Sequence, residues 1–79
     1  MSIELRIQIL RILDEHERTN PSEFVFDTTM AEETRVELSD VRRQLDILAD
    51  EGSVQVEKSG GGVEARILPP GIRAIEEIE

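Results

Sequence analysis

The first part of the chain repeats apolar side chains with the period of a helix, which predicts a helix over residues 3–17. One stripe recurs at three- and four-residue intervals and consists of Ile3, Ile7, Leu10 and Leu13. A second apolar flank consists of Leu5, Ile9 and Ile12. Together they cover more than half of the helix circumference. We therefore expect one flank to pack in the core and the other to contact a symmetry mate.

A turn and a short extended piece follow this helix. Asn20-Pro21 favours a turn, and residues 23–26 are expected to be extended. Phe24 and Phe26 are the only aromatic residues of the chain, and we expect them to fill the core. A base-stacking platform is the alternative, but such platforms combine several aromatic side chains with basic residues that are missing here.

Two short helices are predicted in the middle of the chain. The candidate caps of the first, over residues 30–35, are Asp27, Thr28 and Thr29. The candidate caps of the second, which ends near residue 50, are Ser39 and Asp40. Inward positions in the second helix, spaced i, i+4 and i+7, are Val41, Leu45 and Leu48. The connection over residues 36–38 is short, which forces a sharp crossing of the two helices.

Two alternating segments and a final helix complete the pattern. Residues 53–57 and 63–67 alternate apolar and polar side chains, which predicts two strands joined by a hairpin loop over residues 58–62. Three successive glycines in that loop predict a mobile tip. Pro69-Pro70-Gly71 ends the second strand. The last amphipathic helix carries Ile72, Ile75 and Ile78.

Length and composition limit the possible architecture. A chain of 79 residues is long enough for one core but not for two, so we expect a single domain over residues 1–79. Without cysteine it has neither a disulfide framework nor a thiolate metal site. Apolar runs are far too short for a membrane span, and the N-terminus lacks the layout of a signal peptide. We expect a cytoplasmic protein without a membrane partner.

The charge distribution bears on nucleic-acid binding. The net charge of −9 disfavours it, because Lys and Arg supply most phosphate contacts. The charge is uneven, however, and residues 34–45 and 54–68 carry no net negative charge. These two stretches are therefore the ones that could approach the phosphates of a nucleic acid.

The residues give no indication of catalysis. His16 has no second histidine or cysteine to complete a metal site, and the serines lack a base partner. The glycine triplet lies between strands and no lysine-serine pair follows it, so it does not meet the pattern of a phosphate-binding loop. We therefore expect a protein that is not an enzyme and that has no metal or cofactor.

The order helix, short strand, helix, helix, two-stranded wing, helix is the winged-helix arrangement. Ala31, Arg35 and Val41 stand at the spacing at which helix-turn-helix motifs place a small residue, a turn glycine and a buried valine. Residues 45–52 look like the end of the recognition helix in bacterial and archaeal winged-helix regulators, and residues 65–72 are similar to their strand-to-helix junction. The chain thus resembles small winged helix-turn-helix DNA-binding proteins of archaea and bacteria.

This resemblance implies an α+β fold with a three-helix core, a two- to three-stranded antiparallel sheet as the wing, and a C-terminal helix. The implied bounds are about 29–51 for the helix-turn-helix, 53–68 for the wing and 70–79 for the C-terminal helix. Two residues depart from the family: Arg35 replaces the turn glycine, and Leu68 replaces a threonine. The first departure indicates either an altered turn geometry or a longer connection.

In the family the third helix enters the major groove and the wing touches the backbone or the minor groove, so roles follow from position. The DNA contacts implied on the recognition helix are Ser39, Arg42, Arg43 and Gln44. Those implied on the wing are Lys58, Ser59, Gly60 and Arg66. The residues expected at a dimer interface are Leu5, Ile9, Ile12, Ile75 and Ile78. Asp46 and Asp50 share the outward face of the helix and would repel phosphates. The alternative is that the basic residues are solvated and only balance nearby carboxylates.

Two functions remain open at this point. The first is a transcriptional regulator that binds double-stranded DNA as a homodimer. The second is an acidic winged-helix module that binds a protein partner and no DNA, which the net charge of −9 favours.

Overall fold

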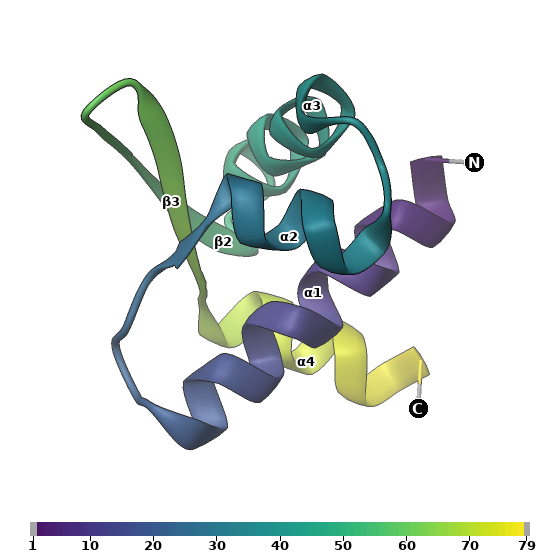
Figure 1. Cartoon of the computed structure of the whole chain (residues 1–79). Coiled ribbons are helices and arrows are strands. Elements are labelled where there is room, and N and C mark those ends of the chain that lie inside the picture. The colour runs from purple at the N-terminus through teal and green to yellow at the C-terminus, as the bar shows by residue number, and fades with distance from the viewer. Residues whose placement is uncertain (1, 79) are drawn as a thin grey trace.

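The computed structural model of the chain describes residues 2–78 and has the predicted α+β winged-helix architecture (Figure 1). Its elements in chain order are α1 (Ser2–Thr19), β1 (Val25–Phe26), α2 (Asp27–Thr34), α3 (Leu38–Asp50), β2 (Val54–Ser59), β3 (Gly62–Ile67) and α4 (Pro69–Ile78). The hairpin of β2 and β3 extends to one side of the helices, and α4 runs beside α1 below α2 and α3.

Helix α1 continues two residues beyond its predicted end. Arg18 and Asp14 form an ion pair of 2.8 Å at i, i+4 spacing, which favours another helical turn. The Thr19 hydroxyl also donates to the carbonyl of Glu15 at 3.1 Å. The helix ends before Pro21, as the sequence predicts.

The turn between α2 and α3 is tight. Helix α2 starts at Asp27, earlier than predicted, and ends at Thr34; the C-cap residue Arg35 has a left-handed φ of 59° and ψ of 38°. Arg35 thus adopts the conformation of the family's glycine, and the connection is not lengthened. Helix α3 starts at Leu38, so neither predicted cap is used; Glu37 stands at the N-cap without a side-chain capping hydrogen bond.

The sheet has the strand order β1-β3-β2 and is antiparallel throughout. The hairpin is longer than predicted because pairing continues to Ser59 and Gly62. Only Gly60 and Gly61 form the turn, with φ of 53° and 85°. A two-residue turn with positive φ at both positions matches the twist of its strands, so this tight turn replaces the expected five-residue mobile loop.

Every helix and every strand contributes at least one side chain to a single core. Its members are Leu5, Ile9, Leu10, Leu13, Val25, Met30, Val41, Leu45, Leu48, Val54, Ala65, Ile67 and Ile75. The inward positions predicted for α3 are confirmed, since Val41, Leu45 and Leu48 are all buried.

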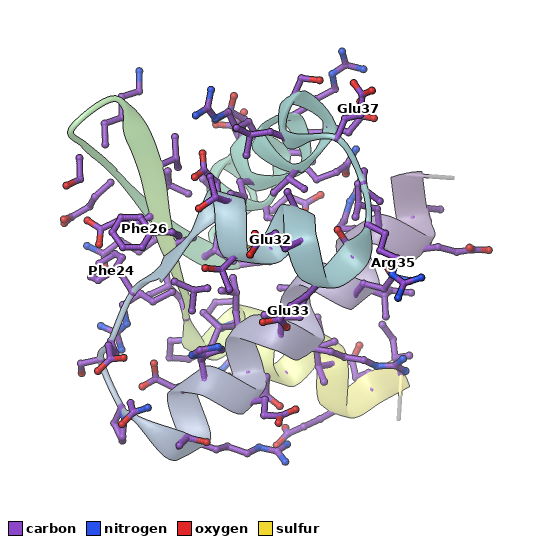
Figure 2. All side chains as sticks on the ribbon, viewed as in Figure 1. Phe24, Phe26, Glu32, Glu33, Arg35 and Glu37 are labelled. Carbon is purple, nitrogen blue, oxygen red and sulfur yellow. The ribbon has the colours of Figure 1, made fainter. Side chains whose placement is uncertain are left out.

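The two phenylalanines do not fill this core, contrary to the prediction. Phe26 is 49% exposed and Phe24 is half-buried. Side chains alternate across a strand, and Val25 takes the inward position opposite Ala65. Both rings therefore lie on the outer side of the sheet (Figure 2).

The predicted dimer residues need correction. Leu5, Ile9 and Ile75 are 8%, 0% and 1% exposed, because α1 and α4 pack on each other and on the rest of the chain. They fill the core of the monomer and are not accessible for contact with a second copy of the chain. Ile12 is only partly buried and Ile78 is 50% exposed. Within residues 2–78, no helix combines the length and apolar character that crossing a bilayer requires.

Candidate nucleic-acid interface

The outward face of α3 carries polar and charged side chains. Ser39, Arg43 and Asp46 are exposed, whereas the opposite face of the helix is buried. A shallow hollow over this face is lined by Leu38, Ser39, Arg42, Arg43 and Asp46. The structure thus brings together three of the four residues predicted on the recognition helix.

A cleft separates α3 from the wing. It has a volume of about 490 Å³, with Arg42 and Asp46 on the helix side and residues 58–63 on the wing side. Lys58, Ser59 and Gly60 are all exposed near the hairpin turn. Three of the four predicted wing residues therefore face the recognition helix across this cleft.

Arg42 is held by the carboxylate of Asp27, which the sequence pattern predicts only as a helix cap. Its Nε donates a hydrogen bond of 2.7 Å to Oδ2 of Asp27, which is 1% exposed. The other carboxylate oxygen, Oδ1, accepts the backbone N–H of Thr28 at 2.8 Å. That N–H belongs to the first turn of α2, where backbone donors lack helical partners and favour an anion. The ion pair thus ties the start of α2 to the recognition helix.

Gln44 does not belong to the exposed face, which corrects the expectation from the resemblance. It is 5% exposed and lies on the inward side of α3. Its Oε1 accepts a hydrogen bond of 3.3 Å from Nε of Arg6 in α1. Arg6 also forms an ion pair of 3.7 Å with Glu51. Gln44 therefore links α3 to α1 and lies off the exposed face of α3.

Arg66 likewise lies away from the hairpin turn, which corrects its predicted wing role. It pairs with Gln55, close to the base of the hairpin. Its Nη2 donates to Oε2 of Glu17 at 3.3 Å, and both side chains are largely buried. The same carboxylate oxygen accepts the backbone N–H of Ser22 at 3.1 Å. Arg66 therefore joins the sheet to α1 and the loop that follows it.

Carboxylates dilute the positive charge of this surface. Asp46 lines both the hollow and the cleft, next to Arg42. Glu37 and Asp40 are exposed at the start of α3. The surface is thus mixed in charge. Any DNA contact therefore depends on the position of each basic side chain more than on a uniform positive potential. Among the described residues 2–78, no group of three or more acidic, histidine or cysteine side chains is arranged to hold a metal ion.

Three solved structures that are similar to this chain are described as a DNA-binding protein or as transcriptional regulators. A candidate DNA-binding protein from Ralstonia eutropha JMP134 superposes with a TM-score of 0.83 at 20% identity, over 95% of this chain and 94% of that one. The transcriptional regulator BldR from Sulfolobus solfataricus gives 0.76 at 22% identity, over 94% of this chain and 50% of that one. The antimony-specific transcriptional repressor AntR gives 0.66 at 23% identity, over 98% and 63%.

These likenesses establish the winged-helix fold. This chain spans about half of the length of BldR and under two thirds of the length of AntR. No family model matches the sequence, and a search of curated proteins finds no match.

Proposed function

We propose that the protein is a DNA-binding transcriptional regulator that places α3 in the major groove and the β2–β3 hairpin against the backbone. The observation that carries this proposal is the grouping of Arg42 and Arg43 on the exposed face of α3, across a cleft from Lys58 on the wing. A winged helix presents these two elements to a duplex. The likeness to structures described as transcriptional regulators supports the same function.

We further propose that the protein acts as a homodimer. Ile3 in the first turn of α1 is 65% exposed and Ile78 in the last turn of α4 is 50% exposed. Both turns lie on the same side of the molecule in Figure 1. A two-fold dimer that covers these side chains would present two recognition helices to a pseudo-palindromic site.

A second candidate function is an interaction module for a basic protein partner. The net charge of −9 and the exposed ring of Phe26 favour it. Such a module would form a complex with protein and would not interact with duplex DNA. The two functions therefore differ in one directly measurable property.

An NMR titration of labelled protein with a random-sequence duplex separates these functions. At low salt we expect shifts confined to residues 38–46 and 58–63, which weaken near physiological salt because phosphate contacts release counterions. Arg43→Gln and Lys58→Gln should reduce the shifts. Arg73→Gln, which removes an exposed cation from α4, is the matched control. Absence of shifts at both salt concentrations contradicts DNA binding and favours the interaction module.

A further inference from the structure

The ion pair between Asp27 and Arg42 has a geometry that goes beyond joining two helices. The Asp27 carboxylate is almost completely buried, whereas the Arg42 side chain is 41% exposed. A buried ion pair is weak evidence for stability, because desolvation of the charges offsets their attraction. It does fix the position of the exposed partner. Asp27 therefore restrains a side chain on the surface where α3 would meet DNA.

The restraint acts on one edge of the guanidinium. Arginine has five N–H donors in a planar fork, and Asp27 engages the Nε donor. The terminal Nη groups stay available, and Arg42 lines both the hollow over α3 and the cleft beside the wing. A long side chain that is ordered before binding loses less conformational entropy when it binds. Arg42 is thus preorganised as a fork at the proposed groove-facing surface.

Arg43, the next residue of the same helix, differs from Arg42 in its ion pairing. It is exposed and forms no ion pair with any other residue between 2 and 78. An exposed positive charge without a paired carboxylate suits a phosphate contact, which carries no sequence information. The charge of Arg42 is largely balanced by Asp27, and Asp46 lies close by. This balance weakens attraction to phosphates, whereas the Nη donors remain available for hydrogen bonds to a base.

We infer that Arg42 reads a guanine through its Nη groups and that Asp27 is the positioning residue that sets this contact. Guanine is the base that offers two acceptors, O6 and N7, on its major-groove edge, and arginine binds them as a bidentate fork. The inference rests on the proposed function, since it requires that α3 enters the major groove. It assigns base specificity to Arg42 and backbone contact to Arg43.

The test begins with in vitro selection of duplexes from a randomised library by the full chain. Affinity is then measured for the selected duplex and for one in which the preferred G·C pair is replaced by A·T. We expect the wild type to prefer G·C by about tenfold or more. Arg42→Ala should abolish this preference. Arg43→Ala should weaken binding to both duplexes alike and leave the preference intact.

Asp27→Asn is the decisive variant, because it keeps the shape of the side chain and removes the charge that holds Nε. It should reduce the preference to less than about threefold while affinity for the A·T duplex is retained. Asp27→Glu keeps the charge but displaces it, and it should reduce the preference for G·C in the same way. This variant replaces Asp27→Asn in the test if the asparagine variant does not fold. The ratio of affinities, unlike affinity itself, does not change through a loss of stability alone.

The outcomes separate this inference from the proposed function. If wild-type protein binds no duplex of the library, both are overturned. If it binds and both Asp27 variants keep the wild-type preference, only the positioning role is overturned. If Arg42→Ala keeps the wild-type preference for the G·C duplex, the assignment of the guanine contact is overturned, while DNA binding stands.

Discussion

Gly71, in the first turn of α4, lies directly against the backbone of Ser53, at the start of the wing. A Cβ added to Gly71 would clash with the Ser53 carbonyl oxygen and stand 2.8 Å from Cγ1 of Ile67. The same carbonyl accepts the backbone N–H of Leu68 at 2.9 Å. A backbone group with this hydrogen bond cannot move aside without loss, so only glycine allows α4 to pack here.

Gly71→Ala should therefore lower the free energy of unfolding by about 1 to 3 kcal/mol, the usual cost of overpacking. Urea unfolding followed by circular dichroism measures it. Gly62→Ala is the control, because its Cβ would meet its neighbours at the ordinary contact distances of 3.7 and 3.8 Å. Equal unfolding midpoints for the two variants would contradict the close approach of α4 to Ser53.

Arg35 is strained by its left-handed conformation, with φ at 59°, and its side chain extends outward from the turn (Figure 2). Arg35→Gly removes this strain, since glycine adopts positive φ without a Cβ clash. Arg35→Ala removes the same charge and keeps the Cβ. We expect the glycine variant to exceed the alanine variant in free energy of unfolding by about 1 kcal/mol. Thermal unfolding of both variants gives the comparison, and equal stability would exclude strain at this turn.

Arg66 should matter for stability and not for DNA binding. Its contact with Glu17 joins residues 49 positions apart in the sequence. Arg66→Gln should lower the free energy of unfolding by about 1 kcal/mol, as expected for a charged hydrogen bond that is partly solvated. Its effect on duplex affinity should match that of Arg73→Gln, which changes the net charge equally. A larger loss of duplex affinity for Arg66→Gln than for Arg73→Gln would contradict this prediction and indicate that Arg66 contacts DNA.

Salt should stabilise the folded protein. With a net charge of −9, self-repulsion favours the expanded chain, and added ions screen it. The urea midpoint should rise between about 0.05 M and about 1 M NaCl. A variant with Glu32→Gln and Glu33→Gln, both exposed on α2, should be more stable at low salt and respond less to NaCl. A midpoint independent of salt in the wild type would show that the charge is already compensated.

The dimer proposal predicts opposite results for buried and exposed isoleucines. Ile9 is 0% exposed, so Ile9→Glu should unfold the protein, because an unpaired charge cannot be buried. Ile3→Glu and Ile78→Glu alter exposed side chains and should give a folded monomer. Sedimentation measures the mass and circular dichroism the fold. A wild type that sediments as a monomer at high micromolar concentration would exclude the dimer.

Local periodicity accounts for the parts of the fold that were predicted. The spacing of Val41, Leu45 and Leu48 identified the inward face of α3, and alternation identified both strands of the wing. These patterns indicate which side of a helix or strand is apolar. Because the domain has a single core, the apolar side of each element packs toward it. The element order then indicated the winged-helix fold.

The candidate site was predicted only in part. Ser39, Arg42 and Arg43 are grouped on α3 as expected, and their DNA contacts stay predictions. Gln44 lies on the inward side of α3, contrary to the prediction, because Arg6 of α1 supplies a hydrogen-bond donor for its buried amide oxygen. No sequence pattern distinguished Asp27 from its neighbours as the partner of Arg42, 15 positions away.

The sequence by itself determined the elements and their order, since helix and strand patterns depend on residues a few positions apart. The tertiary structure decided that both apolar flanks of α1 contribute to the core, and it decided which basic residues are engaged by carboxylates. It also decided that Arg35 must be left-handed, because α2 and α3 are both held by the same core. Such outcomes depend on distant residues that folding brings into contact, and no local pattern encodes them.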